Sequence, residues 1–485
     1  MRLSPLDFTI LAAYLMGITL FGMHFRRGQR DIRDYFLGGR TAPWWALAFS
    51  IVATETSTLT IIGTPALAFA GNLAFLQLVL GYVVGRVLIC FLLIPQYFRG
   101  EFYTAYQLIE KRFGERMKSI AAAIFLVTRA LGEGVRIAAI AKVVSVVFGT
   151  DTRLSVVLVI GLTLIYTFEG GMKAVIWTDV VQLLLYLTGS VVAFALLLER
   201  IPGGWAEVTQ VAAAAGGKLR VFDFTFSLTR TYTFWSGVLG GAFLTMASHG
   251  TDQSIVQRLL AARSQRQSTA ALLASGVIVL GQFTVFLVLG VMLYVFNQHA
   301  PLIAPGGDLD RIFPEFVVRE MPVGLKGLVL AAIGAVAMSN ASGSLNSMAA
   351  SSVVDIYHVG GRQIAPERVL RLSRWTTLGW GVVLLLLGMV RWGPVLEAGL
   401  TILSFTFGSL LGLFLLGSLN PRATPNGALV GMTIGLGTLL YCKFKTPLAW
   451  TWYVLVGAVT TYLAGSLASL LNRLWRAGAR IARRT

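Results

Sequence analysis

The chain of 485 residues is 56% hydrophobic, only 13% of its residues are charged, and its formal net charge is +18. A soluble domain carries about 25% charged residues, so this composition excludes a soluble protein. Apolar stretches of about 15–28 residues recur from end to end, long enough to cross a hydrocarbon core about 30 Å thick. We therefore predict an all-α polytopic membrane protein.

The apolar stretches predict about 13 transmembrane helices. In chain order they cover residues 8–23, 44–71, 74–98, 120–148, 154–168, 175–198, 234–248, 270–296, 328–354, 375–390, 395–416, 428–442 and 448–471. When the loops are assigned alternately to two sides, one side holds 24 Lys and Arg residues and the other 12. Because positive residues favour the cytoplasm, we predict a multi-pass cell-membrane protein with its N-terminus outside and its C-terminus inside. The basic charge thus indicates topology in a lipid bilayer and not nucleic-acid binding.

Two spans contain residues that interrupt helices. The second includes SIVATETSTLTIIGTP, residues 50–65, where Gly63 and Pro65 at the end of the stretch are expected to break the helix. The seventh includes the glycine-rich FWSGVLGGAFLTMASHGTDQ. Membrane helices tolerate breaks where the freed backbone groups face protein or a water-filled cavity. Matching breaks in two halves of a chain indicate a transporter binding site.

Because the two interrupted spans lie five apart, we predict two five-helix inverted repeats with discontinuous second and seventh helices. The predicted divisions are a first helix and cytoplasmic loop in 1–43, a first repeat in 44–198, a second repeat in 199–416, and two helices with a basic tail in 417–485.

The ninth span, AAIGAVAMSNASGSLNSMAASSVVDIY, has six Ser and Asn residues within nine positions. Hydroxyl and small residues in membrane helices commonly serve helix packing. Their density here favours a second interpretation, in which this span and the carbonyls of a broken helix supply the five or six oxygens that a hard cation needs.

Charged residues within the spans are candidates for substrate binding. In the fourth span Arg129, Glu133 and Arg136 are spaced i,i+4 and i,i+3, so they share one helix face. One interpretation is a self-neutralising network of these three residues, with Glu55 as an optional further partner of one arginine. The other leaves one arginine to bind a substrate carboxylate, which its planar fork suits. Arg86 either pairs with Glu55 or extends to the membrane surface.

Asp179 and His249 each allow a structural and a functional interpretation. An intramembrane carboxylate such as Asp179 is a functional candidate, although its place four residues into the sixth span also fits the interface. His249, beside the glycine-rich stretch, is structural, or it lines a cavity and makes transport pH-dependent.

Four segments in order resemble the sodium/solute symporter family, and the resemblance covers nearly the whole chain. They are RDYFLGGR, EGGMKAVIWTDVVQ, GTDQSIVQRLLAARS and SGSLNSMAASSVVDIY. The resemblance implies a leucine-transporter-type fold that works by alternating access.

The resemblance also implies sodium ligands between the second and ninth spans. These are the backbone carbonyls of Ala53, Thr56 and Val336, the Ser339 hydroxyl, and Asn340, which stands where the family usually has Ser or Thr. An amide oxygen also ligates sodium. Asp179 and Ser342 fit a further sodium used by some members, but Gly343 stands where another hydroxyl is often found.

The candidate substrate residues depart from those of sugar-carrying members, which use Gln, Asn, Glu and Lys. This chain offers four residues at aligned positions and four charged residues within the spans, namely Thr60, Thr245, Ser248, His249, Glu55, Arg129, Glu133 and Arg136. The pattern argues against a hexose and favours a carboxylate or an amino-acid-like solute.

We therefore predict a monomeric, sodium-coupled symporter that imports a small organic solute. A proton-coupled symporter using Glu55 or Asp179 is the alternative, and a transporter-like sensor or channel is a further one. No paired carboxylates, nucleophile elbow, metal cluster or phosphate loop in the sequence indicates an enzyme.

Overall fold

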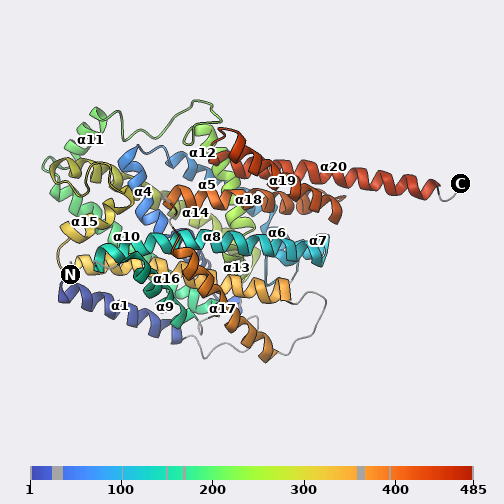
Figure 1. Cartoon of the computed structure of the whole chain (residues 1–485), viewed down its shortest axis with the longest axis horizontal. Helices are drawn as coiled ribbons and strands as arrows, with labels where there is room; N and C mark the ends of the chain where they lie inside the picture. The colour runs from blue at the N-terminus through green and yellow to red at the C-terminus, as the bar shows by residue number, and fades with distance from the viewer. Residues whose placement is uncertain are drawn as a thin grey trace.

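The computed structural model describes residues 3–24, 37–100, 102–148, 151–167, 171–357, 366–390, 392 and 395–482. These residues form helices, turns and connecting segments, with no β-strand in any of the described ranges (Figure 1). The expected all-α fold is therefore confirmed. The long helices α8 and α14 run in a similar direction through the bundle, and the C-terminal part of α20 projects beyond it (Figure 1).

The helices follow the predicted spans closely. Their bounds are α1 Pro5–His24, η2 Gly38–Arg40, α3 Trp44–Glu55, α4 Thr58–Ala70, α5 Leu76–Leu92, α6 Ile94–Tyr97, α7 Tyr106–Phe113, α8 Glu115–Phe148, α9 Thr152–Thr167, α10 Gly171–Arg200, α11 Gly204–Ala214, α12 Phe234–Gly250, α13 Gln253–Leu260, α14 Gln265–His299, η3 Leu309–Arg311, α15 Ile312–Glu320, α16 Leu325–Ser351, η4 Ser352–Tyr357, α17 Pro366–Gly388, α18 Val395–Leu419, α19 Pro425–Lys445, η5 Trp450–Trp452 and α20 Tyr453–Ala482. Every predicted span overlaps one of these helices. In the described ranges six helices are long and apolar enough to cross a membrane alone, and the bent pair α3–α4 makes a seventh.

The break in the second span lies earlier than the sequence suggested. Helices α3 and α4 meet at 63° around Thr56 and Ser57, whereas α4 continues through Gly63 and Pro65. Gly63 serves close packing, because a Cβ atom there would lie 2.7 Å from Cβ of Leu396. The predicted discontinuous second helix is therefore confirmed, but its break is not at Gly63 and Pro65, since tertiary contacts hold both residues within α4.

The break in the seventh span lies later than predicted. Helix α12 runs unbroken through its glycines to Gly250, and α13 occupies part of the stretch 251–268 that was expected to be a loop. The Asp252 side chain begins α13 by accepting a hydrogen bond from the Ser254 backbone N–H at 2.8 Å, which is the usual role of an N-cap residue.

The glycines of α12 bring its backbone against that of α5. A Cβ atom at Gly241 would lie 2.3 Å from the Leu78 carbonyl oxygen, and one at Gly81 would lie 2.5 Å from the Gly237 carbonyl oxygen. Small residues allow this close approach of membrane helices. The glycine-rich pattern therefore joins α5 and α12, and it is not what breaks the seventh span.

We predict that Gly241→Ala destabilises the protein because its methyl group has no space between α12 and α5. Overpacking of this kind costs about 1–3 kcal/mol. Gly281→Ala on α14 is the matched control, because its Cβ atom meets nothing within 4 Å and alanine favours a helix by about 0.5–1 kcal/mol over glycine. Melting of the detergent-purified variants measures both effects, and equal melting temperatures would contradict the close contact of α5 and α12.

Candidate functional site

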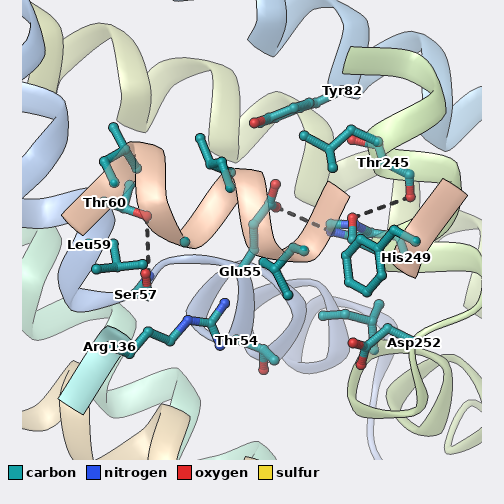
Figure 2. Close-up of a pocket in the computed structure, with 18 of the residues that line it drawn as sticks. Thr54, Glu55, Ser57, Leu59, Thr60, Tyr82, Arg136, Thr245, His249 and Asp252 are labelled. Carbon is teal, nitrogen blue, oxygen red and sulfur yellow. Dashed lines mark hydrogen bonds and ion pairs between the residues drawn. The ribbon is translucent and has the colours of Figure 1, made fainter. Parts of the chain in front are cut away.

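An open cavity of about 110 Å³ lies between the two broken helices (Figure 2). Polar and charged side chains from both breaks and from α8 line it together with apolar side chains of α5, α14 and α18. The lining residues include Thr54, Glu55, Ser57, Leu59, Thr60, Phe75, Tyr82, Arg129, Arg136, Thr245, Ser248, His249, Asp252, Phe283, Leu396 and Leu403. The cavity thus offers hydrogen-bonding groups, charges and an apolar wall.

The structure brings the candidate substrate residues together around this cavity, with the exception of Glu133, which lies behind the wall. Sequence reasoning missed Tyr82, Asp252 and the aromatic lining. Asp252 belongs to the GTDQ segment quoted for the family resemblance, so that motif carried a signal for it. Tyr82 and Phe283 lie on ordinary apolar stretches, which carried none.

Glu55 pairs with Arg86 on α5. The Arg86 side chain is fully buried, and its Nη2 atom contacts Glu55 Oε2 and lies 3.2 Å from His249 Nε2. Its Nε donates to Ser275 Oγ at 3.1 Å and its Nη1 to the Tyr82 carbonyl oxygen at 3.1 Å. Of the two options for Arg86, pairing is therefore the one observed. The suggested pairing of Glu55 with an arginine of the fourth span is wrong, because Glu55 pairs with Arg86.

His249 connects this pair to the cavity wall. Its Nε2 lies 3.3 Å from Glu55 Oε2, and its Nδ1 lies 2.8 Å from Ser248 Oγ. Figure 2 shows the imidazole between the Glu55 carboxylate and the side chains of α12. Both ring nitrogens thus have polar neighbours, and the ring lines the cavity.

The α8 residues form a second buried charge cluster, as their spacing predicted. Arg136 Nη1 donates to Glu133 Oε2 at 3.0 Å, and Arg129 Nε donates to Ser344 Oγ at 2.8 Å. The same serine hydroxyl donates to Glu133 Oε2 at 2.9 Å, while Arg129 Nη1 lies 3.8 Å from Asp252 Oδ2. The cluster links α8 to α16 and to the second break.

The two α8 arginines retain unused donors. Arg129 Nη2 and Arg136 Nε are buried without a hydrogen-bond partner among the described residues. Figure 2 shows the Arg136 side chain extending toward the cavity near Ser57 and Thr54. Arg86, by contrast, uses Nε, Nη1 and Nη2 in contacts with protein atoms. An arginine with spare donors on a cavity wall is suited to an oxyanion.

Two of the candidate sodium ligands, one from the second span and one from the ninth, also converge. Asn340 Nδ2 donates to the Thr56 carbonyl oxygen at 2.9 Å and to the Val336 carbonyl oxygen at 3.0 Å, so both oxygens face one point. Asn340 Oδ1 is buried and makes no hydrogen bond to any described residue. Ala53 lies in the last turn of α3, directly before the break. The Ser339 side chain lies outside the described residues.

Asp179 contacts a cation that sequence reasoning did not consider. Its Oδ2 accepts a hydrogen bond from Arg258 Nη2 at 2.9 Å and another from Ser50 Oγ, and both charged side chains are fully buried. A Cβ atom at Gly343 would lie 3.6 Å from the same Arg258 Nη2, and Ser342 is buried nearby on α16. A guanidinium group therefore lies where Asp179 was a candidate ligand of a second sodium ion.

An all-helical bundle with two broken helices and a polar cavity between them defines a membrane transporter of the leucine-transporter type. The sodium:solute symporter family model matches residues 35–435. A solved structure of a Na+-coupled sialic acid symporter, in a substrate-bound outward-open state, superimposes with a TM-score of 0.89 at 28% identity, covering 96% of this chain and 98% of the other.

Two relatives extend the match. The sodium/sialic acid symporter of Aliivibrio fischeri is 29% identical over 474 residues, covering 96% of this chain and 93% of the relative. The human sodium/iodide cotransporter is 30% identical over 462 residues, covering 91% and 70%. The chain therefore belongs to the sodium:solute symporter family, whose members are sodium-dependent transporters and not enzymes.

We predict that Arg86→Met destabilises the protein strongly, because it leaves the mostly buried Glu55 charged and without its guanidinium partner. Removing one member of a buried pair costs about 3–5 kcal/mol. The double variant Glu55→Gln with Arg86→Met should recover much of this loss, since no uncompensated charge remains. Thermal unfolding in detergent measures the coupling, and additive losses in the double variant would contradict it.

Proposed function

We propose that this protein imports a small organic anion together with Na+, and that carboxylates are the favoured class. The observation that carries the proposal is the state of the α8 arginines. Arg129 and Arg136 line the cavity, and each has one buried donor that no described residue uses. A buried donor left without a partner is unfavourable, and a carboxylate bound at Arg136 supplies the missing acceptor.

The remaining lining suits an organic body attached to the carboxylate. Leu59, Leu396 and Leu403 line the cavity together with Phe283, so an apolar part of the solute is removed from water there. Asp252 on the same wall is a partner for the ammonium group of an amino-acid-like solute. The relatives named for sialic acid and iodide carry anions, which supports an anionic substrate.

The proposed sodium site uses the point at which the Thr56 and Val336 carbonyl oxygens converge, with the Ala53 carbonyl and Ser339 as further ligands. The Asn340 amide nitrogen lies close to this point and donates to both carbonyls. Rotation of the Asn340 amide would exchange its nitrogen for Oδ1, turning a donor into a sodium ligand. The buried Oδ1 without a partner gives that rotation a driving force once a cation is bound.

Coupling between sodium and substrate follows from their shared segment. Thr56 belongs to the proposed ion site, while Glu55, Ser57 and Thr60 line the substrate cavity. An ion that holds the break in one shape favours the state competent for substrate, which is a population shift that requires differential binding. Each positive charge entering the cell gains about 2.3 kcal/mol per 100 mV of membrane potential. The protein would do this as a monomer with its N-terminus outside.

We predict that Arg136→Gln abolishes stabilisation by carboxylates but keeps stabilisation by sodium. A ligand at a hundredfold excess over its Kd stabilises the folded state by about 2.7 kcal/mol, so the rise in melting temperature should disappear for the variant. Arg266→Gln on the exposed start of α14 is the matched control. The screen uses amino acids, carboxylates and sugars in NaCl and KCl. An unchanged carboxylate response in Arg136→Gln, or a response to sugars alone, would contradict the proposed substrate class.

We predict opposite sodium responses for two variants of Asn340. Asn340→Asp places a carboxylate near two carbonyl oxygens. Its melting temperature should therefore be lower in KCl than that of the original protein, and it should rise more when KCl is replaced by NaCl. Asn340→Leu keeps the side-chain shape but removes the ligand, so its sodium-specific rise should be lost. A full sodium-specific rise in Asn340→Leu would remove Asn340 from the site, and melting that follows pH but not sodium would favour proton coupling.

A further inference from the structure

The segment VFDFTFSL, residues 221–228, places apolar side chains on the surface between α11 and α12. The exposed fractions are 46% for Phe222, 64% for Phe224, 66% for Phe226 and 50% for Leu228. Exposed apolar area is unfavourable in water by about 25 cal/mol per Å². Several large exposed apolar side chains on one short segment indicate an interaction surface.

The segment is held by hydrogen bonds to three other parts of the chain. The Asp223 backbone N–H donates to Gln77 Oε1 at 2.9 Å, and its carbonyl accepts from the Phe234 N–H at 2.7 Å. The Leu228 carbonyl accepts from the Ala449 N–H at 2.8 Å. Because the backbone is held along its length, the apolar side chains are presented outward by a defined structure.

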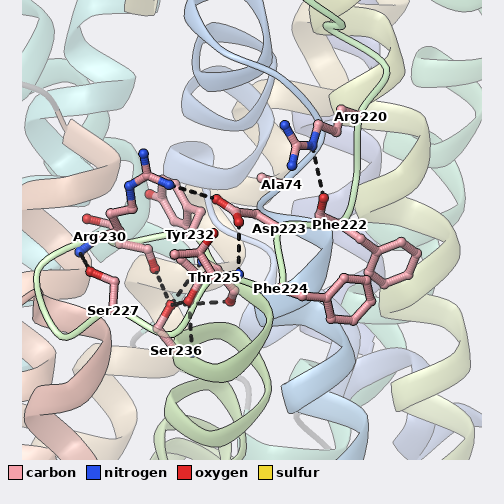
Figure 3. Close-up of polar contacts among 12 residues, drawn as sticks. Ala74, Arg220, Phe222, Asp223, Phe224, Thr225, Ser227, Arg230, Tyr232 and Ser236 are labelled. Atoms are coloured by element: carbon pink, nitrogen blue, oxygen red, sulfur yellow. Dashed lines mark hydrogen bonds and ion pairs between the residues drawn. The ribbon is translucent and has the colours of Figure 1, made fainter.

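The polar and apolar side chains of the segment face different ways. Figure 3 shows Asp223 and Thr225 near Ser236 and the start of α12, while the rings of Phe222 and Phe224 point away from them. The Phe222 and Phe224 rings stack with centroids 5.7 Å apart, and the Phe224 ring lies 5.0 Å from that of Phe234. The result is an aromatic face separate from the polar contacts.

This aromatic face continues onto α12. Trp235 Nε1 donates to the Phe224 carbonyl oxygen at 3.2 Å, and Trp235 is 42% exposed. Leu239, one turn further along α12, is 41% exposed. Since α12 is a predicted membrane span, exposed apolar residues on it face lipid, and tryptophan at the start of a span is typical of the membrane interface.

Two exposed arginines flank the segment in sequence, Arg220 before it and Arg230 after it. Arg220 Nε donates to the Phe222 carbonyl oxygen at 3.0 Å, and Arg230 Nη1 lies 3.3 Å from Asp223 Oδ2. Both side chains are exposed. Exposed guanidinium groups on either side of an apolar segment match a layer in which phosphate groups lie above hydrocarbon.

We propose that residues 220–230 and Trp235 form a membrane anchor that inserts into the interfacial layer of the phospholipid bilayer where α12 begins. The phenylalanine rings enter the boundary between headgroups and acyl chains, and the two arginines contact phosphates. Because α12 is joined to α5 through glycine contacts, and α5 carries Tyr82 and Arg86, the anchor holds one wall of the cavity at a fixed depth.

The test uses spin labels on the full chain in vesicles of phosphatidylethanolamine and phosphatidylglycerol. Cys90 and Cys442, the two cysteines present, are first replaced by serine. Labels are then attached to Phe224→Cys and Phe226→Cys. Thr225→Cys is the matched control, since this exposed residue lies between them on the polar side, and Gln210→Cys on the exposed face of α11 reports water. Melting temperatures confirm that each variant is folded.

Labels at 224 and 226 should collide several-fold more often with oxygen than with a water-soluble nickel chelate, and labels at 225 and 210 should show the reverse. Equal nickel accessibility at 226 and 225 would place the segment in water and overturn the anchor. Strong spin–spin broadening at 226 that disappears on dilution with unlabelled protein would assign the face to a second copy of the chain, which would also overturn it.

Discussion

Backbone polar groups at the break between α3 and α4 must be satisfied without bulk water, and much of the surrounding structure meets this requirement. The Ser57 N–H donates to Thr60 Oγ1 at 3.3 Å, and the Thr56 carbonyl accepts from Asn340 at 2.9 Å. A free backbone group in a membrane interior is unfavourable by several kcal/mol. The hydroxyl-rich second span and the amide-bearing ninth span are therefore needed for the break to exist. The same oxygens give the proposed sodium site its chemistry.

The buried arginines differ in how many of their donors have partners within the protein. Those whose donors are supplied with partners have a structural role, whereas those with unused donors are candidates for a functional one. Arg86 has its contacts supplied by Glu55, Ser275 and the Tyr82 carbonyl, and Arg258 by Asp179, Ser50 and its own helix. Buried charges without such partners are very unfavourable. The α8 arginines alone, of those discussed, combine incomplete pairing with a place on the cavity wall. In the proposed function, this incomplete pairing leaves hydrogen-bonding capacity for the solute.

The sequence predicted the helices well and the contacts between them poorly. Spans could be read from hydropathy because a membrane helix must satisfy its own backbone. The i,i+3 and i,i+4 pattern predicted the α8 cluster for the same local reason. The Arg258–Asp179 pair joins residues 79 positions apart, so only the packing of α10, α13 and α3 discloses it. Glycine and proline misplaced both breaks, because these residues also serve close contacts whose partners are distant in sequence.

The two breaks contribute unequally to the proposed transport cycle. The first supplies Thr56 to the ion site and lines the cavity with Glu55, Ser57 and Thr60, whereas the second lines the cavity with His249 and Asp252 but contributes no candidate sodium ligand. In the proposed cycle, sodium would therefore influence the solute through α3, α4 and α16. Because α12 is joined to α5 by glycine contacts, that unit forms a comparatively rigid wall. In this arrangement the first break is the element that sodium shapes, and the second is the surface against which the solute is held.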